Sequence, residues 1–223
     1  MAVMSKLLIN SDKPVVFLGA GELRPEILAE ALTYARQIFA ADGGAIAALA
    51  AGHVPELVIG DLDSIDPATR AALPADRLLE VTEQETTDFQ KLAARVRAPV
   101  ALAVGFTGGR LDHTLAVMNA LVAETGRGVV VIGTEDICFH VPDRLTLDLP
   151  AGTRVSLFPM RRVEGRQRGL RWPLDGLVFD PAGRIGTSNE ALGGPVELEF
   201  SGPGMLVILP RAQLAHAVAA LGG

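Results

Sequence analysis

The chain has almost no cysteine, since Cys138 is the only one among its 223 residues. A single cysteine excludes an intrachain disulfide and cannot build a thiolate metal cluster, which predicts a reducing compartment. Cys138 stands in the apolar run 137–139. We therefore interpret it as a buried small hydrophobic residue rather than as a nucleophile.

The sequence also lacks an excess of positive charge and any long apolar run. Its 20 basic and 26 acidic residues give a net charge of −6, so it offers no general attraction for nucleic acid or anionic lipid. The longest apolar runs, such as 100–106, fall far short of the ~20 residues of a membrane-spanning helix. We expect a cytoplasmic protein with neither nucleic acid nor membrane as a partner.

The apolar residues, 49% of the chain, follow one pattern up to about residue 134. Short β-branched runs alternate there with alanine-rich segments of helical period, which is typical of a mainly parallel sheet with helices around it. The predicted strands are residues 15–18, 37–41, 57–60, 77–81, 100–106 and 129–133. The predicted helices are residues 25–36, 45–51, 67–73, 87–97 and 112–125. This part of the chain is predicted to be an α/β domain.

After about Glu135 the pattern changes. Alternating or β-rich runs at 144–149, 153–158, 196–200 and 205–209 are separated by glycine and proline turns, which indicates antiparallel strands. A short helix is predicted at 213–221. The predicted fold class is α/β, with an N-terminal, mainly parallel α/β domain followed by a smaller antiparallel β domain, and the boundary falls near residues 134–144.

Acidic residues follow several of the predicted strands. Asp42 closes the second strand, Asp61 and Asp63 close the third, Asp88 opens a helix, and Asp112 stands at the start of another. In open α/β sheets the carboxyl ends of the strands form one crevice, so these five carboxylates are expected to meet there. Like charges repel, and Mg²⁺ relieves the repulsion by taking oxygen ligands. We expect a Mg²⁺ site, with Asp61 and Asp63 on one face of a strand-like segment.

Glycines stand beside these acids. Gly43 and Gly44 follow the first acid, Gly60 precedes the next pair, and Gly108 and Gly109 lie ahead of the last. Glycine lets backbone N–H groups approach a ligand closely, and the N-termini of the following helices carry a positive partial charge suited to phosphate. A metal beside a phosphate cradle indicates phosphoryl transfer.

Each of these signals also has a structural interpretation. Asp88 and Asp112 could instead cap helices, and Asp66 is interpreted as a cap only. The turn at 19–22 lacks the third glycine of a dinucleotide fingerprint, so it is either close to phosphate or a plain turn. His113 either orients a neighbour or a phosphate, or is structural. The individual signals therefore leave the function open.

In combination, four segments resemble the thiamine pyrophosphokinase (thiamine diphosphokinase) family. They are residues 41–44, 55–65, 84–91 and 105–113, in this order. In the β half, residues 169–174 and 186–190 look like the thiamine-binding segment of that family. The resemblance runs from residue 15 to residue 210.

The resemblance implies an α/β catalytic domain at 1–138 and a β-sandwich domain at 139–223 that binds thiamine and forms a homodimer with shared active sites. It implies Mg²⁺-dependent transfer of pyrophosphate from ATP to the hydroxyl of thiamine, with release of AMP. Two alternatives stay open, namely a metal-dependent phosphohydrolase with water as nucleophile and a non-catalytic thiamine or nucleotide sensor.

The same resemblance implies a role for each candidate residue. The catalytic residues would be Asp61, Asp63, Asp88, Asp112 and Arg110, and the metal ligands Asp61, Asp63 and Asp88. ATP would be bound by Asp42, Gly43, Gly44, Gly108, Gly109, Arg110 and His113. Thiamine would be bound by Gln84, Asp88, Trp172, Thr187, Ser188 and Asn189.

Trp172 is the only tryptophan of the chain. Its flat face suits a cationic aromatic ring, and the alternative is a core residue. Arginines at 162, 166, 168 and 171 precede it. We interpret the arginine run as a solvated loop, and contact with an anion is its alternative.

Overall fold

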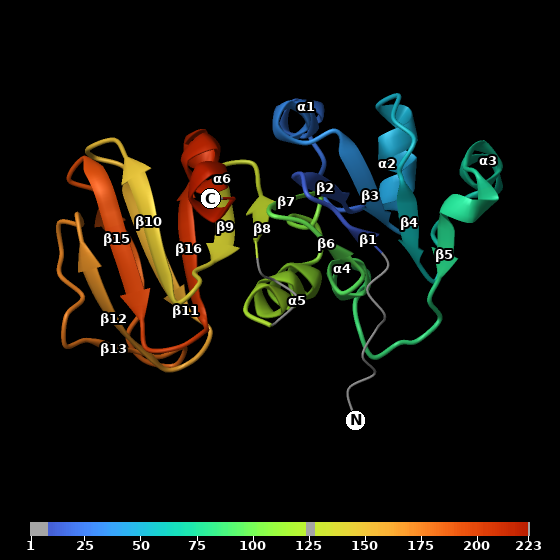
Figure 1. The fold of residues 1–223 in the computed structure, drawn as a ribbon. Helices are drawn as coiled ribbons and strands as arrows, with labels where there is room; N and C mark the ends of the chain where they lie inside the picture. The colour runs from blue at the N-terminus through green and yellow to red at the C-terminus, as the bar shows by residue number, and fades with distance from the viewer. Residues whose placement is uncertain (1–8, 124–127, 223) are drawn as a thin grey trace. The chain divides into compact units, whose positions relative to one another are not determined.

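The structure, a computed structural model, describes residues 9–123 and 128–222, which fall into two compact units (Figure 1). Of the described residues, the first unit contains those up to Ala120 together with Val131–Gly133, and the second contains those within 121–130 and from Thr134 onwards. Strand β8 (Val129–Ile132) is thus divided between them. In the described ranges, no helix is both long enough and apolar enough to cross a membrane.

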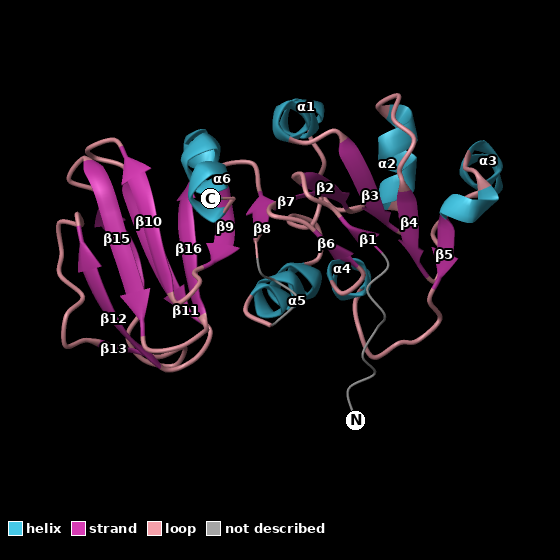
Figure 2. Cartoon of the chain, viewed as in Figure 1, coloured by secondary structure: helices cyan, strands magenta, loops and turns pink. Residues whose placement is uncertain are grey.

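A parallel sheet forms the centre of the first unit (Figure 2). Its order is β7-β2-β3-β4-β5, and each neighbouring pair is parallel. The strands are β2 (Val15–Leu18), β3 (Gln37–Ala41), β4 (Leu57–Gly60), β5 (Leu78–Glu80) and β7 (Ala101–Val104). All residues of β2 and β7 are buried, as expected for strands covered on both faces. The order changes direction at β2, which is where such sheets bind ligands beyond the carboxyl ends of their strands.

Helices connect the strands of this unit. They are α1 (Pro25–Tyr34), α2 (Gly44–Ala50), α3 (Pro67–Ala72), α4 (Asp88–Ala93) and α5 (Leu111–Leu121), and a 3₁₀ turn, η1, covers Ala75–Arg77. The Asp66 carboxylate accepts hydrogen bonds from the backbone N–H groups of Ala68 and Thr69, both at 2.9 Å. This confirms that Asp66 is a helix cap. The helix predicted at 112–125 ends as α5 at Leu121, and positions 124 and 125 lie outside the described residues.

The helix predicted at 87–97 is too long. It ends at Ala93, and β6 (Val96–Arg97) pairs in parallel with β1 (Ile9–Asn10). Val96 is buried in this arrangement. Pairing with a strand far away in the sequence outweighs the helical propensity of this alanine-containing segment, because propensity is only a weak preference.

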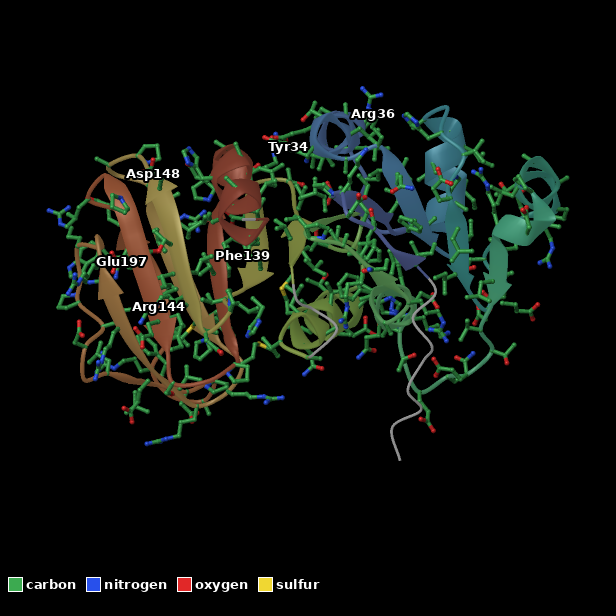
Figure 3. All side chains as sticks on the ribbon, viewed as in Figure 1. Tyr34, Arg36, Phe139, Arg144, Asp148 and Glu197 are labelled. Carbon is green, nitrogen blue, oxygen red and sulfur yellow. The ribbon has the colours of Figure 1, made fainter. Side chains whose placement is uncertain are left out.

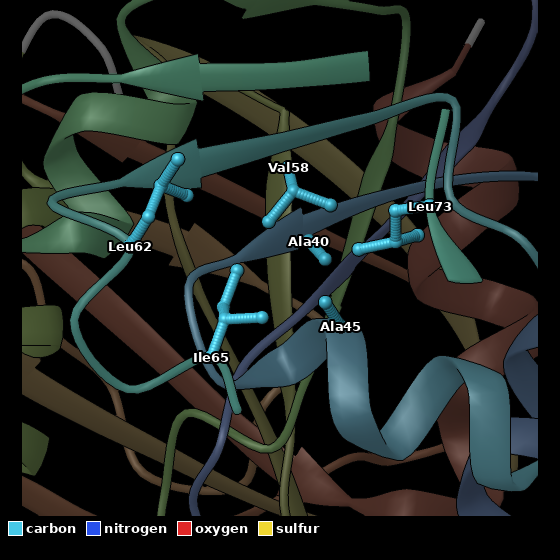
Figure 4. Close-up of a cluster of buried hydrophobic side chains, with 6 residues drawn as sticks. All are labelled: Ala40, Ala45, Val58, Leu62, Ile65 and Leu73. Carbon is cyan, nitrogen blue, oxygen red and sulfur yellow. The ribbon is translucent and has the colours of Figure 1, made fainter. Parts of the chain in front are cut away.

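A buried apolar cluster anchors the loop after β4 (Figure 4). Its members are Ala40, Ala45, Val58, Leu62, Ile65 and Leu73. Leu62 and Ile65 belong to the loop itself, and Leu62 is buried although it stands between two aspartates. Burying these two side chains ties the loop to α2, β3 and β4. The position of the acidic loop is thus fixed by its apolar residues.

Two antiparallel sheets make up most of the second unit, which confirms the predicted fold class. One has the order β10-β15-β12-β13, and the other contains β14-β11-β16-β9. The strands are β9 (Asp136–His140), β10 (Arg144–Leu149), β11 (Arg154–Pro159), β12 (Val163–Arg168), β13 (Val178–Phe179), β14 (Gly186–Glu190), β15 (Gly194–Phe200) and β16 (Met205–Pro210), followed by the 3₁₀ turn η3 (Arg211–Gln213) and helix α6 (Leu214–Leu221). Buried and exposed residues alternate along β10 and β15, as expected for strands with one solvated face.

The prediction of a solvated loop for the arginine run was wrong in part, because residues 163–168 form β12, whereas Arg162, Arg166, Arg168 and Arg171 are exposed as predicted. Its Arg166 and Arg168 lie opposite Glu199 and Glu197 of β15. From the other side of β15, Arg144 Nη2 lies 2.9 Å from Glu199 Oε2; Figure 3 labels Arg144 and Glu197 on this sheet. Opposite charges on neighbouring strands stabilise a sheet, and the ion pair of Arg144 with Glu199 is such a contact.

Cys138 is buried in β9, and burial raises the pKa of its thiol to about 12. A thiol with such a pKa is almost never a thiolate at neutral pH, and the thiolate is the nucleophilic form. The prediction of a buried small hydrophobic residue is therefore confirmed.

Candidate active site

A cleft of about 620 Å³ lies in the first unit at the carboxyl ends of β2, β3, β4 and β7. Its lining includes residues 19–21 after β2, Asp42 and Gly43 after β3, Asp61 and Ser64 after β4, residues 84–89 and Lys91 around the start of α4, residues 105 and 106 after β7, and Gly108, Gly109, Arg110 and His113 near the start of α5. The volume is typical of small-molecule sites, which range over about 300–1,000 Å³. The position of the cleft, at the carboxyl ends of the strands, is where the sheet topology predicts a ligand site.

Three carboxylates converge at this edge of the sheet. Asp42, Asp61 and Asp63 each have an oxygen within 4.8 Å of the oxygens of the other two. The prediction of a strand-like segment at 61–63 was wrong, because β4 ends at Gly60 and Leu62 has a φ of 62°. The carboxylates are brought together by a turn, in which the buried Leu62 side chain holds the backbone in a left-handed conformation.

Asp42 is the most constrained member of this carboxylate cluster. It is 4% exposed, has a φ of 42°, and its Oδ1 has no hydrogen-bond partner in the described part of the chain. Burial raises the pKa of Asp42, a hydrogen bond with Ser64 opposes this, and the charges of Asp88 and Asp61 add to the rise. A buried carboxylate with one unpartnered oxygen is costly when ionised. Its position in the cleft therefore suits a bound cation.

Asp61 is held by two donors. The backbone N–H of Asp63 donates to its Oδ1 at 3.4 Å, and the amide of Gln84 donates to its Oδ2 at 3.3 Å. These hydrogen bonds lower the pKa of Asp61, and the charge of Lys91 acts in the same direction. Asp61 is thus ionised at neutral pH, and Gln84 links the loop after β4 to the segment before α4.

Asp88 does not cap the helix that it opens. Thr87 does so in a capping box with Gln90, and Asp88 Oδ1 lies 3.2 Å from Lys91 Nζ. The Lys91 side chain is 3% exposed and lines the cleft. Lysine is almost never fully buried without a charge partner. No role was predicted for Lys91 from the sequence. The available signal was its i, i+3 spacing from an aspartate on a helix that faces other acids.

Arg110 and Asp112 form a forked pair. Arg110 Nε donates to Asp112 Oδ1 at 3.1 Å, and Arg110 Nη2 donates to Oδ2 at 2.6 Å. This pairing lowers the pKa of Asp112 to about 2. Arg110 and His113 line the cleft, and Asp112 is not among its lining residues in the described ranges. Asp112 thus orients Arg110 instead of joining the carboxylate cluster.

The candidate phosphate-binding glycines fall into two groups. Gly43, Gly108 and Gly109 line the cleft. Gly44 begins α2, and a Cβ at this position would lie 2.1 Å from the carbonyl oxygen of Leu18. Gly44 is therefore required for the close packing of α2 against the end of β2. The turn at 19–21 also lines the cleft, which places it near the predicted phosphate site.

The second unit holds the other candidate thiamine-binding residues. Trp172 is 52% exposed, so the core interpretation of this residue was wrong. Thr187 and Ser188 are exposed on β14, whereas Asn189 is buried. Ser188 has a φ of 62°, and its N–H donates to Ser156 Oγ at 3.0 Å.

Solved structures with this fold include enzymes from yeasts and bacteria. The thiamin pyrophosphokinase from Candida albicans has a TM-score of 0.74 at 17% identity, over 92% of this chain and 93% of that one. The thiamine pyrophosphokinase from Bacillus subtilis has a TM-score of 0.69 at 22% identity, over 89% of this chain and 98% of that one. At these identities the likeness shows the fold.

Sequence comparison adds a relative and two family models. The chain is 29% identical to thiamine pyrophosphokinase 1 of Oryza sativa subsp. japonica over 156 residues, which are 61% of this chain and 59% of that protein. The chain thus spans about three fifths of the length of this relative. The model described as "Thiamin pyrophosphokinase, catalytic domain" matches residues 28–131, and "Thiamin pyrophosphokinase, vitamin B1 binding domain" matches residues 139–204. With both domain models matched in order over most of its length, the chain belongs to the thiamine pyrophosphokinase family.

Proposed function

We propose that this chain is an ATP-dependent thiamine diphosphokinase, which transfers pyrophosphate from ATP to the hydroxyl of thiamine and releases AMP. The observation that carries the proposal is the convergence of Asp42, Asp61 and Asp63 beside a cleft at the carboxyl ends of parallel strands. Membership of the family supports the same reaction. In this proposal residues 1–138 are catalytic, and residues 139–223 bind thiamine and form the dimer.

The carboxylate cluster fits Mg²⁺ on chemical grounds. Mg²⁺ prefers oxygen ligands, and the unpartnered Oδ1 of buried Asp42 is such an oxygen. We assign Asp61, Asp63 and Asp88 as candidate ligands. Asp42 is added because it forms the carboxylate cluster with Asp61 and Asp63, to which Asp88 does not belong in the described residues. When bound, Mg²⁺ would neutralise charge on the phosphates of ATP.

ATP is assigned to the glycine-rich edges of the cleft. Arg110 supplies a planar guanidinium, which suits bidentate phosphate recognition. Asp112 is a catalytic residue only through Arg110, because its carboxylate fixes the orientation of that guanidinium. The remaining residues assigned to ATP are Asp42, Gly43, Gly44, Gly108, Gly109 and His113, of which Gly44 acts through packing.

Thiamine is assigned to Gln84 and Asp88 in the first unit and to Trp172, Thr187, Ser188 and Asn189 in the second. Asp88 lines the cleft and is positioned by Lys91. A carboxylate in that place is suited to accept the proton of the thiamine hydroxyl as it attacks phosphorus. Trp172 offers an exposed aromatic surface to the cationic ring.

The reaction is tested by incubating the chain with ATP, Mg²⁺ and thiamine and analysing the products by mass. We expect thiamine diphosphate and AMP in equal amounts, without free phosphate. Release of phosphate with unchanged thiamine would instead identify a phosphohydrolase. Binding of thiamine or nucleotide without any product would identify a sensor. Omitting thiamine is the control, because a kinase then forms no AMP.

We further propose a homodimer in which each active site combines the carboxylates of one protomer with the partner's Trp172 and the partner's Ser188. Isologous two-fold dimers place the same residues of both chains at one interface. This arrangement gives the β domain a direct part in catalysis.

A further inference from the structure

Trp172 has an exposed side chain on a tightly held backbone. Asn189 is 7% exposed, and its side-chain amide bonds both main-chain groups of Trp172. Its Oδ1 accepts from Trp172 N at 3.1 Å, and its Nδ2 donates to Trp172 O at 2.8 Å. The same Oδ1 also accepts from the N–H of Glu190 at 2.8 Å. These bonds use both lone pairs of the Asn189 oxygen, so the oxygen is occupied within the protein.

One face of the indole is already covered. The guanidinium carbon of Arg171 lies 5.5 Å from the centroid of the Trp172 ring. The guanidinium is held in turn by Glu190, with Nη1 at 3.1 Å from Oε1. The main chains are joined as well, because Arg171 N donates to Glu190 O at 2.9 Å. Side-chain and backbone contacts therefore both favour this position of the cation over the ring.

From these contacts we infer that Asn189, Arg171 and Glu190 are positioning residues for Trp172, which leave one face of the indole for a flat cationic ring. The inference rests on the proposed function, in which that ring belongs to thiamine. It also assigns the Asn189 oxygen to the protein backbone instead of to the ligand. A side chain fixed before binding loses less rotational entropy on binding, so the arrangement strengthens binding without any added ligand contact.

Tryptophan fluorescence of the full chain tests this inference, because Trp172 is the only tryptophan. The variants are Arg171→Gln, which removes the guanidinium, and Glu190→Gln, which removes its charge partner. Arg171→Lys keeps the positive charge of the wild-type residue. The matched control is Arg144→Gln, which breaks the exposed ion pair with Glu199 elsewhere in the same unit. Each protein is measured for anisotropy, thiamine-dependent quenching, and the KM values of thiamine and ATP.

We expect Arg171→Gln to lower the anisotropy of Trp172 and to raise the Kd of thiamine about fivefold, the ratio that corresponds to the ~1 kcal/mol of an exposed cation–π contact. Glu190→Gln is expected to change both in the same direction, and Arg171→Lys to recover part of the affinity. The KM of ATP in these variants is expected to equal that of the wild type. The Arg144→Gln protein is expected to match the wild type in every measured property. Asn189→Asp, which loses the donation to the Trp172 carbonyl, is expected to weaken thiamine binding further. If it does not fold, the surface variants decide the test.

Two outcomes separate the inference from the proposed function. If the wild type forms thiamine diphosphate but Arg171→Gln binds thiamine equally well or more tightly, the positioning role is wrong and the function stands. If the wild type neither binds thiamine nor forms product, the proposed function and the inference both fail. Equal rises in the KM values of thiamine and ATP would show general damage and overturn the positioning role.

Discussion

At the scale of single residues, backbone strain coincides with the candidate site. In the described ranges, the non-glycine residues with positive φ are Asp42, Leu62 and Ser188. L-residues adopt this region at a cost, and such residues persist where the surrounding structure holds them. Leu62 is held by its buried side chain and Ser188 by its bond to Ser156. The strain thus lies in the segments that carry the candidate metal and thiamine residues.

The first prediction concerns the buried carboxylate of Asp42, whose Oδ1 has no hydrogen-bond partner in the described part of the chain. Asp42→Asn is expected to raise the free energy of unfolding of the metal-free protein at neutral pH, because the amide removes a charge that is unfavourable when buried. Because the folded-state pKa of Asp42 is raised by burial, ionisation at neutral pH destabilises the wild type. That penalty disappears as the pH falls below the usual value of 3.8. The difference between the variant and the wild type is therefore expected to shrink on acidification.

Urea unfolding of both proteins with a chelator, at several pH values, measures this difference. Added Mg²⁺ is the control, because it is expected to stabilise the wild type more than Asp42→Asn. A difference that is independent of pH, or a less stable variant at neutral pH, would contradict the interpretation of Asp42.

The second prediction concerns the two carboxylates of the turn. Asp61→Asn and Asp63→Asn are each expected to abolish turnover, because an amide of nearly the same shape removes charge from the proposed metal site. Each substitution removes one of the carboxylates that repel one another. The melting temperature of the metal-free protein is therefore expected to stay unchanged or to rise. Activity assays over a range of Mg²⁺ concentrations, with thermal melts, measure both effects. Substantial Mg²⁺-dependent activity in both variants would show that the metal site lies elsewhere.

At the scale of elements, the site depends on the close approach of the ends of β3 and β4. A Cβ added at Gly60 would lie 2.7 Å from Asp42 Cβ, closer than such atoms approach. Gly60→Ala is therefore expected to displace Asp42, to cost about 1–3 kcal/mol of stability as overpacking does, and to weaken the dependence of activity on Mg²⁺. Gly202→Ala is the control, because nothing lies within 4 Å of its added Cβ. Urea unfolding and Mg²⁺ titration check the prediction, and equal effects of the two substitutions would refute it.

The same scale shows which elements sequence alone could predict. The strands β2, β3 and β4 have the predicted bounds, because short β-branched runs between helical segments depend mainly on local sequence. The C-terminal end of the helix predicted at 87–97 and the loop predicted at 162–171 were wrong, because β6 and β12 depend on partner strands distant in sequence. The local sequence pattern reflects the conformational preference of each segment, and it does not predict pairing between strands that are distant in sequence.

The candidate site, like the fold, could be predicted from the sequence only in part. Carboxylates at strand ends were predictable because sheet topology brings those ends together. The turn at Leu62, the burial of Lys91 and the bonds between Asn189 and Trp172 were not, since each depends on a contact in three dimensions. The sequence therefore predicted the candidate functional residues. The structure distinguished the residues that line the cleft from those that hold them in place.

At the scale of the whole molecule, the candidate residues belong to different units. The carboxylates and Arg110 belong to the first unit, and Trp172 and Ser188 to the second. The proposed homodimer with shared sites makes a prediction about pairs of inactive chains. Asp88→Asn is expected to damage the catalytic part of a site, and Trp172→Ala the thiamine-binding part. Each variant alone is expected to be nearly inactive, since both copies of the site then carry the same lesion.

Mixing the two variants is the last prediction. If each site takes its carboxylates from one chain and Trp172 from the other, a mixed dimer has both lesions in one site and a second site with none. Random reassortment makes half of the dimers mixed, so activity is expected to recover to about a quarter of the wild type. If each site were completed within one chain, every site of a mixed dimer would carry one lesion. Co-refolding with mixed dimers confirmed by mass, but without activity above that of the separate variants, would therefore exclude the shared site.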